Sequence, residues 1–277
     1  MKTKTPSANR FRNATGAVSV NLRNDMMLHY AMQKSNRALT GLVCALKELD
    51  PNSVQNVELT NPIDYGTYNA KEIILDIKVT FNNSDIMDIE LQMYYDAYWK
   101  ERSVLYLCRT YDTLGKGDDY KLLKPATFVA IMPKSPFPEH PEFYAKFLLL
   151  NTKYHYPYTS NFRLNVLDLS QIENAMDEDY NSGLVHWAKL FLANTWEELN
   201  QIASGNPVFE EVLDLMYTIN TIPQERTLFE AHQKYLSDMA SLRSEKDDTA
   251  VELAETKAEN ERLRQILLEN GIDPDDI

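Results

Sequence analysis

The stretch that decides the fold runs from Ile73 to Tyr94 and reads IILDIKVTFNNSDIMDIELQMY. Apolar and polar residues alternate on both sides of FNNSD, a run of turn-forming residues, and this pattern predicts a β-hairpin. Alternation sends successive side chains to opposite faces of a sheet. One face is expected to join the core. The other is expected to carry Asp76, Lys78, Asp88, Glu90 and Gln92.

A turn centred on Asn83 determines which residues of the two strands face each other. It pairs Lys78 with Asp88. It also pairs Asp76 with Glu90, so two carboxylates lie about 4.5–5.5 Å apart at Cβ, where like charges destabilise a sheet. A divalent cation relieves that repulsion, because carboxylate oxygens are the ligands that Mg²⁺ prefers. The hairpin therefore predicts a metal site at Asp76 and Glu90, suited to polarising a phosphate.

The segments on either side of the hairpin alternate between helical and extended patterns. Apolar residues at period 3.6 predict helices, and short continuous apolar runs predict strands that are buried on both faces. This order of elements predicts an α/β fold in which helices flank a mixed sheet. The expected helices are 25–33, 36–49 and 97–114, and the expected further strands are 57–59, 126–132, 143–150 and 162–169.

The chain after Gly183 is expected to be helical throughout. A short apolar helix covers 184–193, Thr195 opens a capping box, and Pro207 suits the first turn of another helix. No Gly or Pro interrupts 224–270, which predicts one long helix, either continuous or broken. We therefore divide the chain into a flexible basic arm (1–20), a core domain (21–182), a helical extension (183–222) and a long acidic helix (223–277).

The end of the long helix contains a partial heptad repeat. A seam as polar as this one sets the register of a dimer but forms only a weak coiled coil. Two interpretations stay open: a homodimer through this helix, or a solvated acidic helix packed on its own domain. The seam positions are Thr249, Leu253, Thr256, Asn260, Leu263, Leu267 and Asn270.

The formal net charge of the 277 residues is -13, but the charge is unevenly distributed. Excess acid argues against nucleic acid as a partner, because phosphates bind to Lys and Arg. Residues 135–277 hold 11 Lys and Arg against 26 Asp and Glu, whereas residues 1–134 hold 17 against 15. A basic groove in the first half is therefore compatible with the composition.

The sequence also indicates a compartment. Its longest apolar runs are far shorter than the roughly 20 residues that span a bilayer. The N-terminal MKTKTPSANRFRN lacks the apolar core of a signal peptide. We expect a cytoplasmic protein without membrane contact. Cys44 and Cys108 lie in apolar helical patterns and are expected to be buried thiols.

Several segments taken together are similar to one known family. ILDIKV, DIELQM, WKERSVLYLCRTYD, GDDYKLLKPA and VLDLSQIENA resemble the recombination-promoting nuclease (transposase) family, a branch of the PD-(D/E)xK nucleases. The resemblance covers residues 24–191, and the combination is far more specific than D-x13-E-x-Q alone. It implies a restriction-endonuclease-like fold and a Mg²⁺- or Mn²⁺-dependent DNA endonuclease in recombination, mobile-element or defence biology.

The resemblance also implies roles for single residues. The family's two acidic metal ligands fall on Asp76 and Glu90. Gln92 takes the place that most PD-(D/E)xK enzymes give to Lys, and its amide orients a water but carries no charge. Lys78 lies on the same face of the hairpin, and we expect it to supply the missing charge. The structural alternative is a salt-bridged sheet face around Lys78.

Further candidates have a structural interpretation of equal weight. Asp25 matches an Asn-Asp pair near the start of the family, but a carboxylate in a first helical turn also favours the helix dipole. Asp88 is a second candidate of this rank on the polar face. Lys100, Arg102 and Arg109 on the next helix suit the phosphates of DNA, or surface ion pairs.

Two functions from different classes follow. The first is a Mg²⁺-dependent endodeoxyribonuclease. The second is a catalytically inactive nuclease-fold protein that binds DNA or assembles partners through its acidic tail. Gln92 without an adjacent Lys favours the second, whereas Asp76 and Glu90 together favour the first, because a purely structural sheet gains by relieving their repulsion. A transposase with a widely spaced carboxylate triad is a third option, against which the close hairpin argues.

Overall fold

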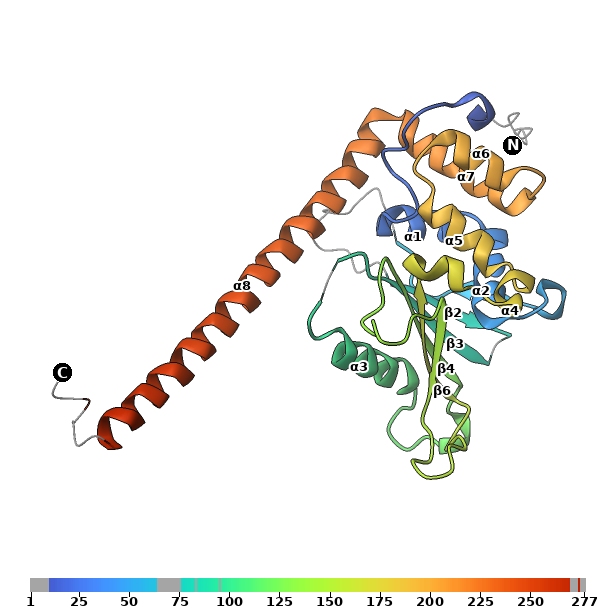
Figure 1. Cartoon of the computed structure of the whole chain (residues 1–277). Coiled ribbons are helices and arrows are strands. Elements are labelled where there is room, and N and C mark those ends of the chain that lie inside the picture. Colours follow the sequence, from blue (N-terminus) through green and yellow to red (C-terminus); the bar gives the residue numbers. More distant parts are fainter. Residues whose placement is uncertain (1–9, 64–75, 83, 95, 270–273, 275–277) are drawn as a thin grey trace. The chain divides into compact units, whose positions relative to one another are not determined.

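The computed structural model describes residues 10–63, 76–82, 84–94, 96–269 and 274 (Figure 1). The chain forms two compact units. The first consists of residues 1–93 and 97–233, and the second of residues 94–96 and 234–277. The sheet and the candidate functional residues all lie in the first unit.

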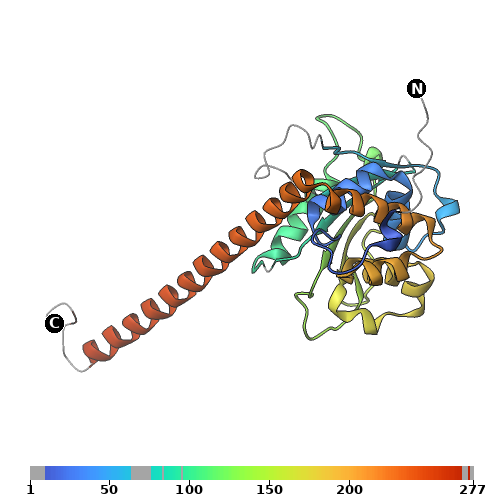
Figure 2. The same ribbon diagram turned by 90° about the horizontal axis from the view of Figure 1, so that it is seen from above.

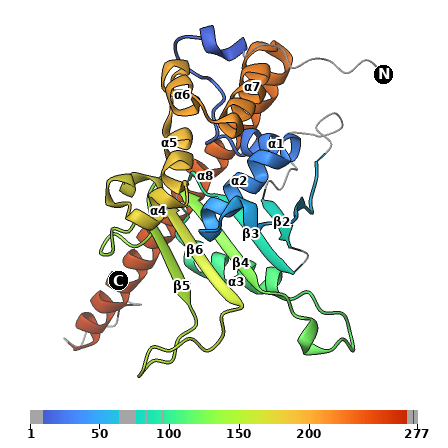
Figure 3. The same cartoon turned by 90° about the vertical axis from the view of Figure 1, so that its right-hand side faces the viewer.

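A six-stranded mixed sheet forms the centre of the first unit, in the order β1-β2-β3-β4-β6-β5 (Figure 3). β1, β2 and β3 pair antiparallel, β4 lies parallel to both β3 and β6, and β5 pairs antiparallel with β6. The predicted α/β class, a mixed sheet flanked by helices, is confirmed. The strands are β1 Val57–Leu59, β2 Ile77–Phe81, β3 Asp85–Leu91, β4 Ala126–Met132, β5 Tyr144–Leu148 and β6 Phe162–Asp168.

The β2–β3 hairpin has the register that its turn predicts. Lys78 lies opposite Asp88, and Ile77 lies opposite Ile89. Asn82 in the turn has a φ of 50°, a left-handed conformation that Asn tolerates well. The expected strand residues 73–75 and the turn residue 83 lie outside the described part of the chain.

Helices cover one face of the sheet and enclose the larger core (Figure 3). α1 (Asp25–Lys34) and α2 (Asn36–Lys47) pack there with α5 (Leu184–Leu192) and α7 (Pro207–Thr221). The sheet contributes its apolar face to this core. The predicted helix 36–49 is observed as α2, and four of its apolar residues are buried in this core: Leu39, Leu42, Val43 and Leu46.

α3 (Trp99–Tyr111) lies on the opposite face of the sheet and encloses a smaller second core (Figure 1). Trp99 and Leu107 of this helix pack on Phe128, Ala130 and Val166 of the sheet. All seven residues of β4 are buried, as its continuous apolar run predicts for a strand covered on both faces. The polar face of the hairpin therefore lies on the side of α3.

The helices after Gly183 belong to the same compact unit as the sheet. Phe191 and Leu213 lie in the larger core, so the expected boundary at 182 does not separate two units. Thr195 and Glu198 form the predicted capping box at α6 (Trp196–Ala203). The smaller elements are α4 Asp177–Asn181 and the 3₁₀ helices η1 Arg10–Asn13, η2 Pro51–Ser53, η3 Tyr120–Leu122 and η4 Leu169–Asn174.

Two expectations about burial are wrong. Residues 10–20 form no arm, because Phe11, Val18 and Val20 are buried and the Val18 amide donates to Asn194 O at 2.8 Å. Long-range packing holds this segment, and packing of that kind leaves no periodicity in the sequence. Cys108 is exposed because α3 buries only a narrow side, whereas Cys44 is buried as expected. Residues 1–9 lie outside the described range.

α8 (Pro223–Glu269) is the predicted long helix, and it is unbroken (Figure 2). Its part after Gln233 belongs to the second unit, where Leu253 and Leu263 are exposed. Residues 270 and 271, expected at its end, are not among those described. Whether this helix forms a homodimer stays a prediction.

The larger core predicts the effect of substituting Leu42, which is fully buried in α2. Leu42→Ala should lower the free energy of unfolding by about 2–5 kcal/mol, because it removes buried apolar area and leaves a cavity. Leu122→Ala is the control, since this side chain is exposed and its loss should cost less than about 0.5 kcal/mol. Urea unfolding measures both. Equal midpoints for the two variants would contradict this core.

Candidate active site

The polar face of β3 lies under α3 and is largely shielded from water. Met87 and Ile89 point into the larger core, so Asp88 and Glu90 between and after them point toward α3. The side chain of Asp88 is only 3% exposed and that of Glu90 is 13% exposed. Burying a carboxylate is costly unless hydrogen bonds or opposite charges compensate. The cations and hydrogen-bond donors that lower this cost are the other residues of the site.

Arg102 of α3 is the cation at Glu90. Its Nη2 lies 2.7 Å from Glu90 Oε1 and also donates to Gln92 Oε1. Charge-assisted hydrogen bonds of this kind are among the stronger polar contacts in proteins. The positive charge beside Gln92 therefore comes from the helix and not from the strand.

Asp88 is the most deeply buried of the candidate carboxylates. Its Oδ2 accepts from Thr110 Oγ1 at 3.1 Å and lies 3.9 Å from Lys78 Nζ. Its Oδ1 has no hydrogen-bond partner among the residues that the structure describes. Burial, followed by the negative charge of Asp76, raises the pKa of Asp88 to about 6. The charge of Lys78 and the hydrogen bond from Thr110 lower this pKa, but they do not offset the effect of burial.

Asp76 lies at the start of β2, in a segment fixed by Asn61. Asn61 Nδ2 donates to Asp76 O at 2.6 Å, and Lys78 N donates to Asn61 Oδ1 at 3.0 Å. Burial raises the pKa of the Asp76 carboxyl, Lys78 and Arg102 lower it, and Asp25 raises it. Asp76 is therefore close enough to two cations and to a further acid for their charges to act on it.

Asp25 reaches the site from α1 and is held by His232 of α8. His232 Nε2 lies 3.2 Å from Asp25 Oδ2, and the imidazole is buried. The preceding residue, Asn24, caps α1 by accepting from Met27 N, and its Nδ2 donates to Phe229 O at 2.9 Å. The first turns of α8 thus fix the beginning of α1. The two partners are 207 positions apart, so no sequence motif indicates this pair.

The structure brings most of the predicted site residues together. Lys100 and Arg109 lie elsewhere on α3: Lys100 Nζ is 4.6 Å from the centre of the Phe137 ring, and the Arg109 guanidinium is 5.9 Å from that of Tyr106. Sequence reasoning missed Asn61, Thr110 and His232, and it considered Arg102 as a contact to DNA or as a member of a surface ion pair but not as the partner of Glu90. The residues brought together are Asp25, Asp76, Lys78, Asp88, Glu90, Gln92 and Arg102.

The cluster suits a hard divalent cation in its chemistry. Its donors are carboxylate and amide oxygens, which Mg²⁺ prefers, and the unpartnered Asp88 Oδ1 together with the raised pKa of Asp76 shows a need for positive charge. Arg102 meets part of that need at Glu90. Within the described ranges, no three Asp, Glu, His or Cys side chains form a ready-made metal site.

Comparison with known proteins gives one match. A family model described as "PD-(D/E)XK nuclease family transposase" matches residues 28–246 of this chain. No curated protein and no solved structure matches it. Among the helices that the structure describes, none has the length and apolar character needed to cross a membrane.

The burial of Asp88 predicts a pH effect in metal-free buffer. Its folded pKa of about 6 lies above the ordinary 3.8, so the folded state binds this proton more tightly than the unfolded state. The resulting stabilisation is complete below about pH 4 and is lost as the pH rises through about 6. Asp88→Asn carries no charge and should be more stable than the parent at pH 7, by at most about 3 kcal/mol.

Urea unfolding of parent and variant in EDTA, from pH 4 to 8, measures this difference. Glu139→Gln, at an exposed position, is the control and should reproduce the parent curve. Parallel curves for the parent and Asp88→Asn would show that Asp88 is not held in a desolvated site.

Proposed function

The chain belongs to the PD-(D/E)XK nuclease family transposases, and from this we propose that it is a DNA endonuclease that hydrolyses phosphodiester bonds with Mg²⁺ or Mn²⁺. The observation that carries the proposal is the shielded cluster of Asp76, Asp88 and Glu90 beside Arg102. Acids grouped at such cost to stability are typical of functional sites. The biological setting we propose is recombination, mobile-element activity or defence.

We assign the metal to Asp76 and Glu90. Both offer carboxylate oxygens, and Asp25 and Asp88 add negative charge around them. A bound Mg²⁺ or Mn²⁺ supplies positive charge to the scissile phosphate and makes a water more acidic. The protein holds these acids by Asn61 on one side of Asp76 and by the strand geometry of β3.

The remaining residues of the site orient a water and supply positive charge. The amide of Gln92 orients a water, and its Oε1 is fixed by Arg102. The guanidinium of Arg102 presents several donors in a geometry that suits phosphate oxygens. Lys78 contributes a second positive charge beside Asp76 and Asp88. The charge that Gln92 lacks is thus available from α3 and from β2.

A second function is favoured by one observation. Arg102 neutralises Glu90 without a metal ion, and this is the arrangement expected of a nuclease fold that has lost catalysis. Such a protein would bind DNA or assemble partners. Both proposals place the protein in the cytoplasm with DNA as its partner, and both leave the C-terminal helix available for a homodimer.

The nuclease proposal predicts metal-dependent cleavage of supercoiled plasmid. We expect the purified full chain to nick DNA with Mg²⁺ or Mn²⁺ but not in EDTA. Asp76→Ala and Glu90→Ala should abolish nicking, because each removes a carboxylate from the metal site. Glu101→Ala is the matched control: it removes an exposed acid from α3 and should cleave like the parent.

Two results would contradict this prediction. If the folded protein is inert with every metal but binds the plasmid, the DNA-binding alternative replaces it. If both variants nick as fast as the parent, the activity belongs to another site or to a contaminant.

Replacing Arg102 and Lys78 one at a time tests which of them supplies positive charge to the cleavage reaction. Arg102→Gln should lower the cleavage rate by about 10²–10³-fold, the loss typical of a donor that stabilises a transition state. Lys78→Gln should lower it less, because this side chain is half exposed and lies nearest to Asp88. Lys189→Gln, which removes an exposed Lys from α5, is the control. Single-turnover rates at saturating Mg²⁺ measure all three, and a larger loss in Lys78→Gln would transfer the role to Lys78.

A further inference from the structure

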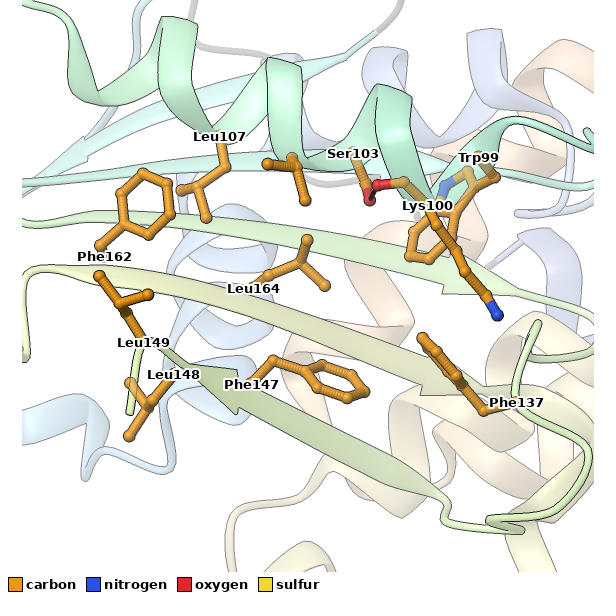
Figure 4. Close-up of a pocket in the computed structure, with 11 residues that line it drawn as sticks. Trp99, Lys100, Ser103, Leu107, Phe137, Phe147, Leu148, Leu149, Phe162 and Leu164 are labelled. Carbon is orange, nitrogen blue, oxygen red and sulfur yellow. Dashed lines mark hydrogen bonds between the residues drawn. The ribbon is translucent and has the colours of Figure 1, made fainter. Parts of the chain in front are cut away.

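An apolar pocket lies beside α3, on the same face of the sheet as the candidate active site (Figure 4). Its volume is about 340 Å³, at the lower end of the roughly 300–1,000 Å³ typical of small-ligand sites. Side chains of α3, β5, β6 and the loop segments next to β5 form its walls, and four of them are aromatic. The aromatic residues are Trp99, Phe137, Phe147 and Phe162.

The side chains at this pocket favour a flat aromatic ligand. Phe137 and Phe147 lie with ring centres 5.1 Å apart, and Lys100 Nζ lies over the Phe137 ring. Trp99 also lines the pocket and is 2% exposed. Aromatic rings of this kind stack well against another ring.

The segment that supplies most of the pocket is richer in basic residues than the chain as a whole. Residues 97–163, which supply the whole lining except Leu164, hold ten Lys and Arg against six Asp and Glu, whereas the chain as a whole has a net charge of -13. Among the lining residues Lys100 carries a positive charge, and such a charge complements the phosphates of a nucleic acid.

The loop after β5 carries further aromatic and basic side chains next to the pocket. Tyr154, Tyr156 and Tyr158 are exposed, and Lys153 Nζ lies 5.1 Å from the centre of the Tyr154 ring. The loop is attached to the pocket, because Tyr158 N donates to O of the lining residue Leu149 at 2.8 Å. Exposed aromatic rings interspersed with cations are what proteins use to stack the bases of a single strand.

One helix connects the pocket with the candidate active site. Trp99, Lys100 and Ser103 line the pocket, while Arg102 on the neighbouring side of α3 contacts Glu90. The candidate active site and the pocket therefore border the same helix.

From these observations we infer that the pocket binds an unpaired nucleobase of single-stranded DNA. The inference rests on the proposed function only in taking DNA as the substrate. It adds that the preferred substrate has an unpaired segment next to the cleaved bond. The competing occupant, an apolar side chain of another protein or of a second copy, is an outcome of the test.

The test fills the pocket and leaves its walls in place. Val104 lines the pocket and is half exposed, so Val104→Phe adds volume without making a cavity in the core. Leu105→Phe is the matched control, because Leu105 is the next residue of α3, is exposed to the same degree and lies outside the lining. The probes are a fluorescein-labelled dT 20-mer and a 20-base-pair duplex, measured by anisotropy in EDTA with the full chain.

We expect Val104→Phe to bind the dT 20-mer roughly 5- to 100-fold more weakly than the parent, the range expected for loss of one base stacked on aromatic rings. Duplex binding should stay unchanged, and Leu105→Phe should match the parent with both probes. Phe147→Ala, which removes one of the stacking rings, should show the same loss. Thermal unfolding checks that all variants are folded.

Equal dT affinity in the parent and Val104→Phe overturns the inference. So does a change in molar mass by light scattering in Val104→Phe with DNA binding intact, which would show that the pocket binds protein. The binding assay needs no cleavage, so the two proposals fail separately. If the parent nicks plasmid but its pocket variants bind the dT 20-mer as tightly as the parent, only the pocket proposal is refuted. A protein that is inert with every metal, but whose Val104→Phe variant loses dT binding, refutes the nuclease alone.

Discussion

The burial of several carboxylates between β3 and α3 is the constraint on which the rest of the site depends. Asp88 and Glu90 cannot leave this position, because the strand alternation that buries Met87 and Ile89 fixes them there. The cost appears in the raised pKa of Asp88, whose first cause is lost water. Lys78 and Thr110 reduce that cost at Asp88 and Arg102 reduces it at Glu90, whereas the negative charge of Asp76 adds to it. A fold selected for stability alone would place apolar residues here.

Much of this arrangement follows from local sequence. The residues of other elements that contact the buried carboxylates cannot be predicted in this way. The alternation around FNNSD specifies the hairpin, its register and its polar face, because strand period and turn position are local properties. The run 126–132 indicates a doubly covered strand for the same reason. Which helix covers the polar face depends on distant packing. Nothing near Arg102 in the sequence distinguishes it from Arg109, although only Arg102 contacts Glu90.

Moving the positive charge from the strand to a helix has a structural consequence. A Lys at position 92 would depend only on the hairpin, whereas Arg102 depends on how α3 packs. Besides the apolar packing of Trp99 and Leu107 on the sheet, two polar contacts hold this helix, from Arg102 to Glu90 and from Thr110 to Asp88. The two helical residues are eight positions apart, which is about 12 Å along a helix. The positive charge at Gln92 therefore depends on the position of α3.

The Arg102–Glu90 pair does not by itself decide between an active and an inactive nuclease. A partly buried ion pair is weak evidence for stability, because the cost of removing both groups from water offsets most of their attraction. If a metal ion took the place of Arg102 at Glu90 and Arg102 bound a phosphate, every charge would still be compensated. The contact that Arg102 makes would then depend on metal and DNA together. Since α3 also lines the apolar pocket, a ligand that shifted this helix would change the affinity for the other ligands by the same factor.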